Sequence, residues 1–318
     1  MPPCLKIEEV TQQMDELPTT ELRNPASHRL DDMPVEDVLR LMNQEDRKVP
    51  GAVEKALPRI AEAVELLVEA WKQGGRWIYV GAGTSGRVAA LDAAECPPTF
   101  GVPSDRVLAL LAGGQTAATQ AIEGAEDDRS AAVRDLESLS LDPGDVVVGL
   151  AASGRTPYVV AAVRHASEKG CATVGISNNP GSELGAAASV GIELDTGPEV
   201  LTGSTRLKAG TSEKLVLNML STASFTRLGK VYENFMVDLQ ATNEKLKDRS
   251  LRIVKEAVGV PDEEARELLH SAGGSVKVAA VMGKARVPAN EARGLLDAAG
   301  GNVRRALEAA RSAHPAER

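Results

Sequence analysis

A glycine-rich turn near residue 81 carries two adjacent hydroxyl groups. The stretch GAGTSG (81–86) places Thr84 and Ser85 between a short apolar run and a helical pattern. Backbone amides and hydroxyls at a helix N-terminus bind anions, because the unpaired N–H groups and the helix dipole favour negative charge. The turn, Gly83 included, is therefore a candidate site for a phosphate group or a sugar. The alternative is a glycine-rich turn that serves only close packing.

A second turn repeats this chemistry. AASGRTP (151–157) follows another apolar run and offers Ser153, Gly154 and Thr156 ahead of a helix that we expect to begin near Pro157. Parallel strands end at one edge of a sheet, and ligands bind beyond that edge. Two hydroxyl-bearing turns of the same kind therefore indicate one shared site.

The first turn also matches G-x-G-x-x-G, the fingerprint of dinucleotide-binding proteins. In those proteins an acid after the second strand binds the ribose. Here the corresponding stretch, VLALLAGGQTAA (107–118), ends in glycines and Gln115. A nicotinamide- or flavin-dependent oxidoreductase is thus a weaker alternative, which an absorbance scan for bound cofactor would test.

Glu95 occupies an unfavourable place for a carboxylate. It ends an apolar, helix-like run and directly precedes Cys96, Pro97 and Pro98. A negative charge at a helix C-terminus opposes the dipole, and apolar neighbours offer it no partner. Because Pro97 disfavours helical geometry at Cys96, we expect the helix to stop near Glu95, with the carboxyl buried and protonated. Such a group could act as a general acid; an ordinary salt bridge is the alternative.

A cluster of acids follows in AIEGAEDDRS (121–130). Its members are Glu123, Glu126, Asp127 and Asp128. One ionised carboxylate here could act as a base beside a protonated Glu95. Spacing alone does not choose among the four, and most acids in such a cluster are simply solvated.

The surrounding pattern predicts a parallel α/β sheet that brings these segments together. Short apolar runs occur at 76–81, 107–112, 145–152, 172–177 and 189–194. Helical stretches separate these runs, apart from a short last crossover. Near-continuous apolar strands that alternate with helices are typical of a sheet covered on both faces. We expect a ligand beyond the carboxyl ends of these strands.

Helical segments flank the predicted sheet. Residues 1 to about 19 form a polar lead, and residues 20–50 are acidic with a helical pattern. Residues 51–73 predict a helix that ends at a glycine pair. After the sheet, an amphipathic helix is expected from about residue 210.

The C-terminal part contains an internal repeat. VPDEEARELLHSAGGSVKVAAVM (260–282) matches VPANEARGLLDAAGGNVRRALEA (287–309), so each copy predicts a helix, a Gly-Gly stop and a second helix. This module resembles ubiquitin-associated domains, and packing or an interface is a more ordinary role for it than catalysis. The predicted domains are 1–57 for an N-terminal arm with helices, 58–230 for the sheet domain, 231–258 for connecting helices and 259–311 for the repeat.

Composition argues against several classes of protein. The 318 residues carry a formal net charge of −9, whereas a nucleic-acid binder needs a basic face. Cys4, Cys96 and Cys171 are far apart, and neither they nor the histidines form a metal-binding motif. No apolar run approaches the roughly 18 residues of a membrane span, and the first residues lack the apolar core of a signal peptide. We expect a soluble, cytoplasmic protein without nucleic-acid, membrane or metal partners.

Four stretches resemble the N-acetylmuramic acid 6-phosphate etherases. They are TELRNP (20–25), GAGTSGR…LDAAECPPTFG (81–101), AIEGAED (121–127) and GPEVLTGSTRLKAGTSEKLVLN (197–218). The two hydroxyl-bearing turns are similar to the ligand loops of sugar isomerase (SIS) domains, which bind phosphosugars on a five-stranded parallel sheet. The last stretch is also similar to the signature of the glucokinase regulatory protein family. The resemblance spans residues 20 to about 310.

The resemblance implies a three-layer SIS fold and a cofactor-independent lyase reaction in cell-wall amino sugar recycling. The family cleaves the ether between D-lactate and C3 of N-acetylmuramic acid 6-phosphate, and water replaces the lactate. In the open-chain sugar a base can remove the C2 proton, while an acid must protonate the poor alkoxide leaving group. A non-catalytic sugar-phosphate regulator is the alternative, and it would not need two catalytic carboxylates. SIS domains commonly pair, so a homodimer is expected.

The resemblance also implies roles for individual residues. It places the acid at Glu95 and the C2 base at Glu126. Ligands for phosphate or sugar are expected from the stretch 197–218, namely Ser204, Thr205, Arg206 and Lys208, with Glu213 as a third acid that could help ring opening. TELRNP could add residues to the site edge, although a capping turn is equally expected; these residues are Glu21, Arg23 and Asn24.

Overall fold

The computed structural model describes residues 17–239 and 244–313. It contains two compact units: the described residues of Met1–Ala93 with Val107–Leu220, and those of Ala94–Arg106 with Ser221–Arg318. Cys4 and most of the polar lead lie outside the described residues. The four-part domain division expected from the sequence stays a prediction.

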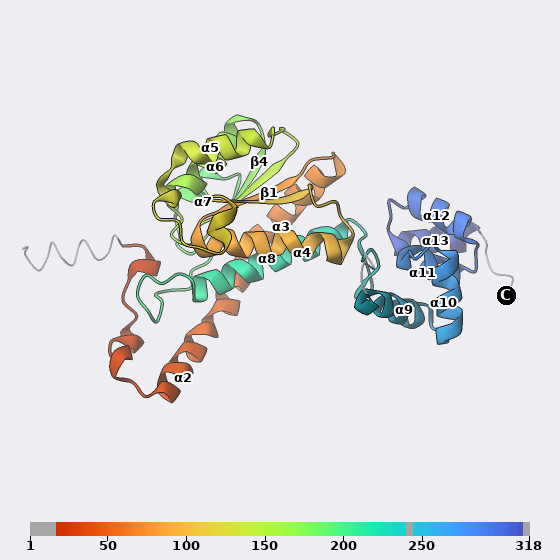
Figure 1. Ribbon diagram of the computed structural model, residues 1–318, viewed down its shortest axis with the longest axis horizontal. Helices are drawn as coiled ribbons and strands as arrows, with labels where there is room; N and C mark the ends of the chain where they lie inside the picture. Colours follow the sequence, from red (N-terminus) through yellow and green to blue (C-terminus); the bar gives the residue numbers. More distant parts are fainter. Residues whose placement is uncertain (1–16, 240–243, 314–318) are drawn as a thin grey trace, which may run out of the picture. The chain divides into compact units, whose positions relative to one another are not determined.

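The first unit is built on a five-stranded parallel sheet (Figure 1). Its strands are β1 (Trp77–Gly81), β2 (Val107–Leu111), β3 (Val146–Leu150), β4 (Ala172–Ser177) and β5 (Val190–Glu193). They lie in the order β2-β1-β3-β4-β5. The five predicted apolar runs are thus confirmed as strands. The central strands β1 and β3 are buried along their whole length, which is why their sequences are apolar at successive positions.

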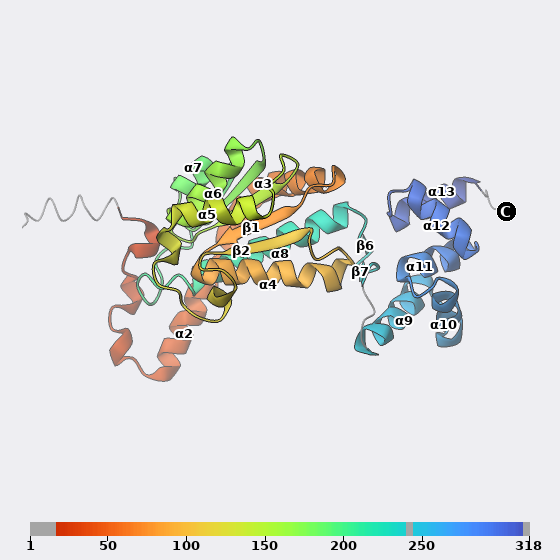
Figure 2. The same ribbon diagram turned by 45° about the horizontal axis from the view of Figure 1, so that its top comes forward.

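Helices cover both faces of this sheet and give the expected three layers. The covering helices are α3 (Lys48–Lys72), α4 (Gly83–Phe100), α5 (Arg129–Ser138), α6 (Pro157–Glu168), α7 (Glu183–Ala187) and α8 (Lys208–Arg227). Helices α5 and α6 lie on one face, and α3, α4 and α8 lie on the other (Figures 1 and 2). None of the helices within the described residues is long and apolar enough to cross a membrane.

The turn between β1 and α4 depends on two glycines. A Cβ atom on Gly86 would lie 2.7 Å from the carbonyl oxygen of Gly81, and one on Gly81 would lie 2.6 Å from the amide nitrogen of Gly86. Only glycine allows this contact, because both obstacles are backbone atoms. The first turn of α4 therefore lies directly against the end of β1.

Helix α4 corrects one expectation. It continues through Pro97 and Pro98 to Phe100, so the prediction that it stops near Glu95 is wrong. Proline fixes φ close to the helical value, and its cost is a missing N–H donor and crowding of the preceding turn. Beyond the prolines the helix is closed by a 2.9 Å hydrogen bond from the Gly101 amide to the Pro97 carbonyl. Stacking of Phe100 on Phe225, with ring centroids 4.5 Å apart, stabilises this end.

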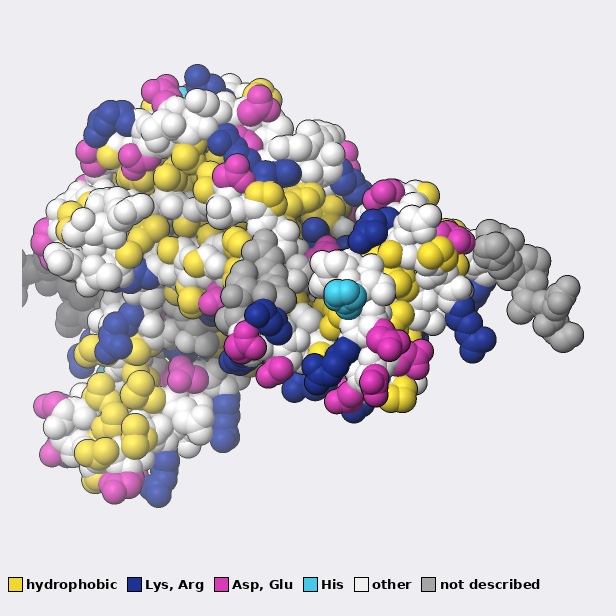
Figure 3. Space-filling model, turned by 45° about the vertical axis from the view of Figure 1, so that its right-hand side comes forward, with side chains coloured by type: hydrophobic (Ala, Val, Ile, Leu, Met, Phe, Trp, Pro, Cys, Tyr) yellow, Lys and Arg dark blue, Asp and Glu magenta, His cyan; other side chains and the backbone are white. Residues whose placement is uncertain are grey.

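The N-terminal region of the first unit is helical, as expected. It contains the short 3₁₀ turns η1 (Thr19–Glu21), η2 (Pro25–Ser27) and η3 (Leu30–Asp32), followed by α2 (Val35–Asp46). Hydrophobic side chains are exposed over α2 (Figure 3). Val35 and Leu39 are 70% and 60% exposed.

The second unit is mostly helical. It contains the hairpin of β6 (Val231–Tyr232) and β7 (Phe235–Met236), then α9 (Glu244–Val258), α10 (Asp262–Ser271), α11 (Val276–Ala285), α12 (Ala289–Ala298) and α13 (Val303–Ala313). The sequence repeat corresponds to α10–α11 and α12–α13. Both Gly-Gly pairs adopt positive φ, which is why glycine ends the first helix of each copy.

A buried ion pair joins the starts of β1 and β3. Asp145 accepts hydrogen bonds from the Arg76 amide at 2.8 Å, the Arg76 Nη2 at 2.6 Å and the Asp142 amide at 3.0 Å. Burial alone would raise the pKa of Asp145, but these hydrogen bonds together lower it below its usual value. The carboxylate therefore stabilises the fold in its ionised form.

We predict that Asp145→Asn lowers the free energy of unfolding by about 3 kcal/mol at neutral pH, because it leaves a partly buried Arg76 without its charge partner. The folded-state pKa of Asp145 is lowered. Its stabilisation is therefore full above the unfolded value near ~4 and is lost as the pH falls through the folded value. Denaturant unfolding at several pH values should show the gap between variant and wild type closing in acid.

Asp37→Asn is the matched control. Asp37 pairs with Arg40 at 3.0 Å, but the two side chains are 53% and 71% exposed. Its loss should change the free energy of unfolding by no more than about 0.5 kcal/mol. Equal effects of the two variants would contradict the role assigned to burial at Asp145.

Candidate active site

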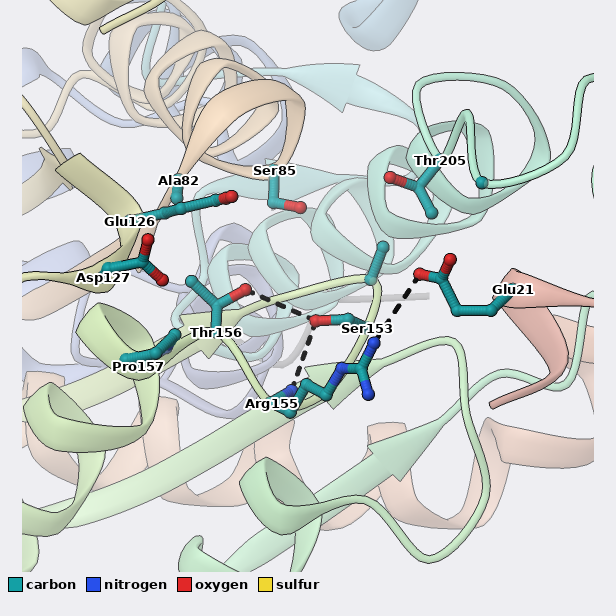
Figure 4. Close-up of a pocket in the computed structure, with 12 residues that line it drawn as sticks. Glu21, Ala82, Ser85, Glu126, Asp127, Ser153, Arg155, Thr156, Pro157 and Thr205 are labelled. Carbon is teal, nitrogen blue, oxygen red and sulfur yellow. Dashed lines mark hydrogen bonds and ion pairs between the residues drawn. The ribbon is translucent and has the colours of Figure 1, made fainter. Parts of the chain in front are cut away.

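A cavity of about 450 Å³ lies in the first unit, beyond the carboxyl ends of the strands (Figure 4). Ala82 and Ala152, which follow β1 and β3, form part of its wall. Six of the residues predicted from the sequence line it: Glu21, Ser85, Glu126, Ser153, Thr156 and Thr205. They come from five separate segments of the chain. The structure thus brings both hydroxyl-bearing turns to one site, as their position after parallel strands predicts.

The turn after β3 presents its hydroxyls to the cavity. Ser153 Oγ lies 3.4 Å from Thr156 Oγ1 and accepts a 3.3 Å hydrogen bond from the Arg155 amide. Gly154 lies behind them with a φ of +68°, and a Cβ atom there would come within 2.4 Å of the Ser182 Cβ. Gly154 therefore shapes the turn and is not among the residues that line the cavity.

Asn179 fixes this turn from behind and was not predicted from the sequence. Its side-chain amide donates to the carbonyls of Ala152 at 3.0 Å and Ser153 at 3.1 Å. Its oxygen accepts a 2.9 Å hydrogen bond from Thr19 Oγ1 and a 3.2 Å bond from the Thr20 amide. One buried amide thus holds the N-terminal arm against the cavity. The sequence feature that could have indicated this role is the pair Asn178-Asn179 directly after the buried strand β4.

The arm itself reaches the cavity through Glu21. Its carboxylate lies 3.9 Å from the Arg155 guanidinium, which also lines the cavity (Figure 4). Asn24 is buried, caps η2 through the Ala26 amide and donates to the Pro198 carbonyl at 3.2 Å. Arg23 is exposed and is not a lining residue. The capping turn expected for TELRNP is thus present at Asn24, and of the three residues expected at the site edge Glu21 alone lines the cavity.

The residues of the turn after β1 have two different roles: one lines the cavity, and another contacts a neighbouring helix. Ser85 lines the cavity, whereas Gly83 and Thr84 do not. The Thr84 Cγ2 lies 3.0 Å from where a Cβ on Gly210 would be, so Thr84 contacts the first turn of α8. Ser85 Oγ forms a 2.9 Å hydrogen bond with Oε1 of Glu213, which is fully buried. Glu213 therefore stands behind Ser85 and does not itself line the cavity.

The acidic cluster separates into different positions. Glu126 and Asp127, in the 3₁₀ turn η5 (Ala125–Asp127), line the cavity and are labelled in Figure 4. Asp128 instead caps α5 by accepting a 2.9 Å hydrogen bond from the Ala131 amide. Glu123 lines a smaller adjoining cavity of about 200 Å³, which Glu126 also borders. The structure therefore separates the four acids by position, which their spacing in the sequence could not do.

Arg87 holds the segment that leads to Glu126. Its guanidinium donates to the backbone carbonyls of Ala117 at 3.1 Å and Gln120 at 3.0 Å. The charge of Arg87 is thus directed at the loop backbone and not at the cavity of about 450 Å³, which it does not line. Its position four residues into α4 links the two segments that carry Ser85 and Glu126.

Glu95 differs from the sequence-based expectation. The residue is exposed on α4, so the desolvation that the sequence argument assumed is absent. It lies in the second compact unit and is not among the residues that line the cavity. Its role as the acid stays a prediction that rests on the resemblance alone.

The loop before α8 is held by a buried ion pair. Lys208 is 1% exposed, and its Nζ donates to Glu45 Oε2 at 2.7 Å and to the Pro198 carbonyl at 2.8 Å. Although burial would raise the pKa of Glu45, its bonds to Lys208 and Lys48 lower it below the usual value. These contacts commit Lys208 to the protein interior, so its predicted role as a ligand lacks support from its position.

Glu199 closes the same loop from its other end. Its carboxylate accepts hydrogen bonds from the backbone amides of Lys208 at 3.2 Å and Ala209 at 3.0 Å, at the N-terminus of α8. Burial raises the pKa of Glu199 despite these bonds. Of the predicted loop ligands, Thr205 lines the cavity, while Ser204 and Arg206 do not. Arg206 borders a separate cavity of about 160 Å³ beside Glu45.

The fold and the site define a class. Residues 130–223 match the SIS domain family, and residues 59–167 match the glucokinase regulatory protein N-terminal SIS domain. Among solved structures, a phosphoheptose isomerase from Neisseria gonorrhoeae superposes with a TM-score of 0.45 at 19% identity, covering 60% of this chain and 98% of that one. The two family matches identify an SIS domain within residues 59–223.

The relatives narrow this class to one family. The chain is 56% identical over 263 residues to an N-acetylmuramic acid 6-phosphate etherase from Geobacillus thermodenitrificans, covering 83% of this chain and 89% of that protein. The N-acetylmuramic acid 6-phosphate etherase of Yersinia pestis has the same identity and coverage. The chain belongs to the family of N-acetylmuramic acid 6-phosphate etherases, as the resemblance of its motifs implied.

We predict that Lys208→Met lowers the free energy of unfolding by about 3–5 kcal/mol, because it leaves the Glu45 charge buried without its inner partner. Lys48→Met is the control: Lys48 pairs with the same carboxylate at 2.7 Å but is 60% exposed. The control should cost no more than about 1 kcal/mol in denaturant unfolding.

The double variant Lys208→Met with Glu45→Gln should recover part of this stability, since no uncompensated charge then remains in the interior. A double variant less stable than Lys208→Met would show that the ammonium group supports the loop independently of Glu45.

Proposed function

We propose that this protein is a cytoplasmic enzyme that cleaves the D-lactyl ether of N-acetylmuramic acid 6-phosphate with water. The products are N-acetylglucosamine 6-phosphate and D-lactate, and the reaction class is a carbon–oxygen lyase that uses no cofactor. The observation that carries this proposal is the 56% identity to etherases over 83% of the chain. Pairing into a homodimer is part of the proposal, because the SIS class commonly pairs.

The cavity supports a phosphosugar as the ligand. Ser85, Ser153, Thr156 and Thr205 present hydroxyls from three loops, and Arg155 adds a positive charge. Hydroxyl and guanidinium donors complement phosphate oxygens. A cavity of about 450 Å³ falls within the ~300–1,000 Å³ range usual for small-molecule sites.

The reaction needs a base and an acid and no electron transfer. In the open-chain form of the sugar, the C2 proton lies next to the aldehyde, and a carboxylate can remove it. The bond from C3 to the lactate oxygen then breaks, and an acid protonates that oxygen as lactate leaves. Water afterwards adds at C3, and a proton returns to C2. The atoms balance as one water consumed and one lactate released.

Glu126 is proposed as the base and Glu95 as the acid. Glu126 lines the cavity together with the hydroxyl-bearing turns, which is the position a C2 base requires. For Glu95 the support is its match to the family motif, since the residue is exposed and is not a lining residue. The position of Glu126 thus supports its proposed role, whereas the proposed role of Glu95 is supported by the family motif.

We predict that the purified protein releases D-lactate from N-acetylmuramic acid 6-phosphate. Turnover in heavy water should place deuterium at C2 of the product, because the C2 proton must leave before elimination. Enzymatic lactate detection and mass spectrometry of the product measure the two outcomes. Release of lactate with only protium at C2 would argue for direct displacement at C3, and no release at all would leave a non-catalytic phosphosugar regulator.

Glu126→Gln and Glu95→Gln should separate the two proposed steps. Each amide keeps the shape of the side chain but cannot transfer the proton, so lactate release should fall by roughly 10²–10⁴-fold in both. Exchange of the C2 proton on substrate should be lost in Glu126→Gln and should persist in Glu95→Gln. Exchange is followed by proton NMR in heavy water.

Glu123→Gln is the matched control for this pair. Glu123 lies three residues from Glu126 and borders the adjoining smaller cavity. Its removal should change lactate release by no more than about threefold, since it has no proposed proton to transfer. Normal lactate release by Glu95→Gln would end the role of Glu95 as the acid.

A further inference from the structure

Ser85 is the one hydroxyl of the two turns whose partner is a completely buried carboxyl group. Its Oγ lies 2.9 Å from Oε1 of Glu213, which has 0% exposure. The second oxygen, Oε2, is buried and has no hydrogen-bond partner among the described residues. A charged carboxylate with one unpaired oxygen in such a place is very costly. The neutral acid avoids this cost, and burial accordingly raises the pKa of Glu213 to about 8.

The protonation state of Glu213 determines what Ser85 offers to the cavity. A serine hydroxyl has one proton to donate. If Glu213 is ionised, its carboxylate accepts a hydrogen bond from the Ser85 hydroxyl. Ser85 then presents only lone pairs to the cavity. If Glu213 is neutral, its own O–H can donate to Ser85 Oγ, and the serine proton is free to point into the cavity.

We propose that Glu213, as a neutral acid, donates its proton to Ser85 Oγ and thereby fixes the Ser85 hydroxyl as a donor to the phosphate group of a bound sugar phosphate. A phosphate dianion only accepts hydrogen bonds, so it selects this arrangement over the ionised one. Glu213 touches no ligand in this proposal and is a positioning residue. The proposal rests on the proposed phosphosugar function and names the residue that makes Ser85 a hydrogen-bond donor to the phosphate.

The charged groups near Ser85 and Glu213 either have an ion-pair partner or are the same in the wild type and in a Glu213 variant. On α8, Lys214 lies 3.8 Å from Asp92 of α4, and Lys208 is bonded to Glu45. None of these groups shifts the pKa of Glu213. That shift comes from burial, which raises the pKa, and from the hydrogen bond to Ser85, which lowers it. On the cavity side, Ser85 faces four charged lining residues: Glu21, Glu126, Asp127 and Arg155. These act equally in the wild type and in a Glu213 variant, so comparison of the two isolates Glu213.

The test is calorimetric binding of N-acetylglucosamine 6-phosphate, the proposed product, between pH 7 and pH 9. The phosphate has a second pKa near ~6, so it is a dianion throughout this range. In the wild type, affinity should fall by about tenfold from pH 7 to pH 9, because Glu213 must regain its proton to bind. Repeating the titration at pH 9 in buffers of different ionisation enthalpy should show uptake of close to one proton.

Glu213→Gln should abolish both effects. Its amide N–H can donate to Ser85 Oγ at every pH, so affinity should stay within about threefold of the wild-type value at pH 7 and should not fall at pH 9. Ser85→Ala should bind about tenfold more weakly at pH 7 and should also lose the pH dependence. Glu62→Gln, which changes an exposed acid on α3, is the control and should retain the wild-type slope.

Each outcome decides the proposal. A Glu213→Gln protein that keeps the proton uptake and the fall in affinity would overturn it, as would wild-type binding without proton uptake. Either result would leave the proposed phosphosugar function intact. Absence of any binding of the sugar phosphate would instead overturn that function and this inference together. Folding of each variant is checked by its denaturation midpoint at pH 7, where Glu213 is neutral in the wild type.

Discussion

The buried pair of Lys208 and Glu45 is the interaction on which the site side of the sheet depends. It joins α2 to the first residue of α8, and the Pro198 carbonyl completes the bonding of the ammonium group. Glu199 binds the amides at the start of α8 and closes the intervening loop upon itself. A charge this deeply buried is tolerated only when its partners are fixed. The loop that carries Thr205 is therefore held at both ends before any ligand arrives.

The rest of the site follows from the parallel sheet. Strands β1 and β3 are neighbours and end level with each other, so the turns that follow them open on one cavity. Gly86 lets α4 start against the end of β1, and Gly154 lets the second turn pass over Ser182. Small residues at these points place backbone amides and hydroxyls close to the sheet edge. Larger residues would push the turns apart.

The sequence predicted the strands and the shared location of the two turns because both depend on patterns that are local in the chain. It did not predict the contacts of Asn179, Glu45 or Arg155, since each of these residues has a partner more than a hundred residues away in the chain. It also misplaced the end of α4. The preference of Cys96 to leave the helix before proline is a local tendency, and packing at Phe100 overrides it.

Hydroxyl groups give a binding site less specificity than their number suggests, because each can donate or accept. What determines their direction is the partner behind them. Asn179 holds the Ser153 carbonyl, and Ser153 Oγ accepts from the Arg155 amide, so the serine proton is directed either to Thr156 Oγ1, 3.4 Å away, or to the cavity. Ser85 has a carboxyl behind it, and only the neutral form of that carboxyl leaves its proton available as well. A site for an anion therefore requires that Glu213 be buried deeply enough to stay neutral. The apolar packing that removes it from water thus serves binding as directly as the hydroxyls that touch the ligand.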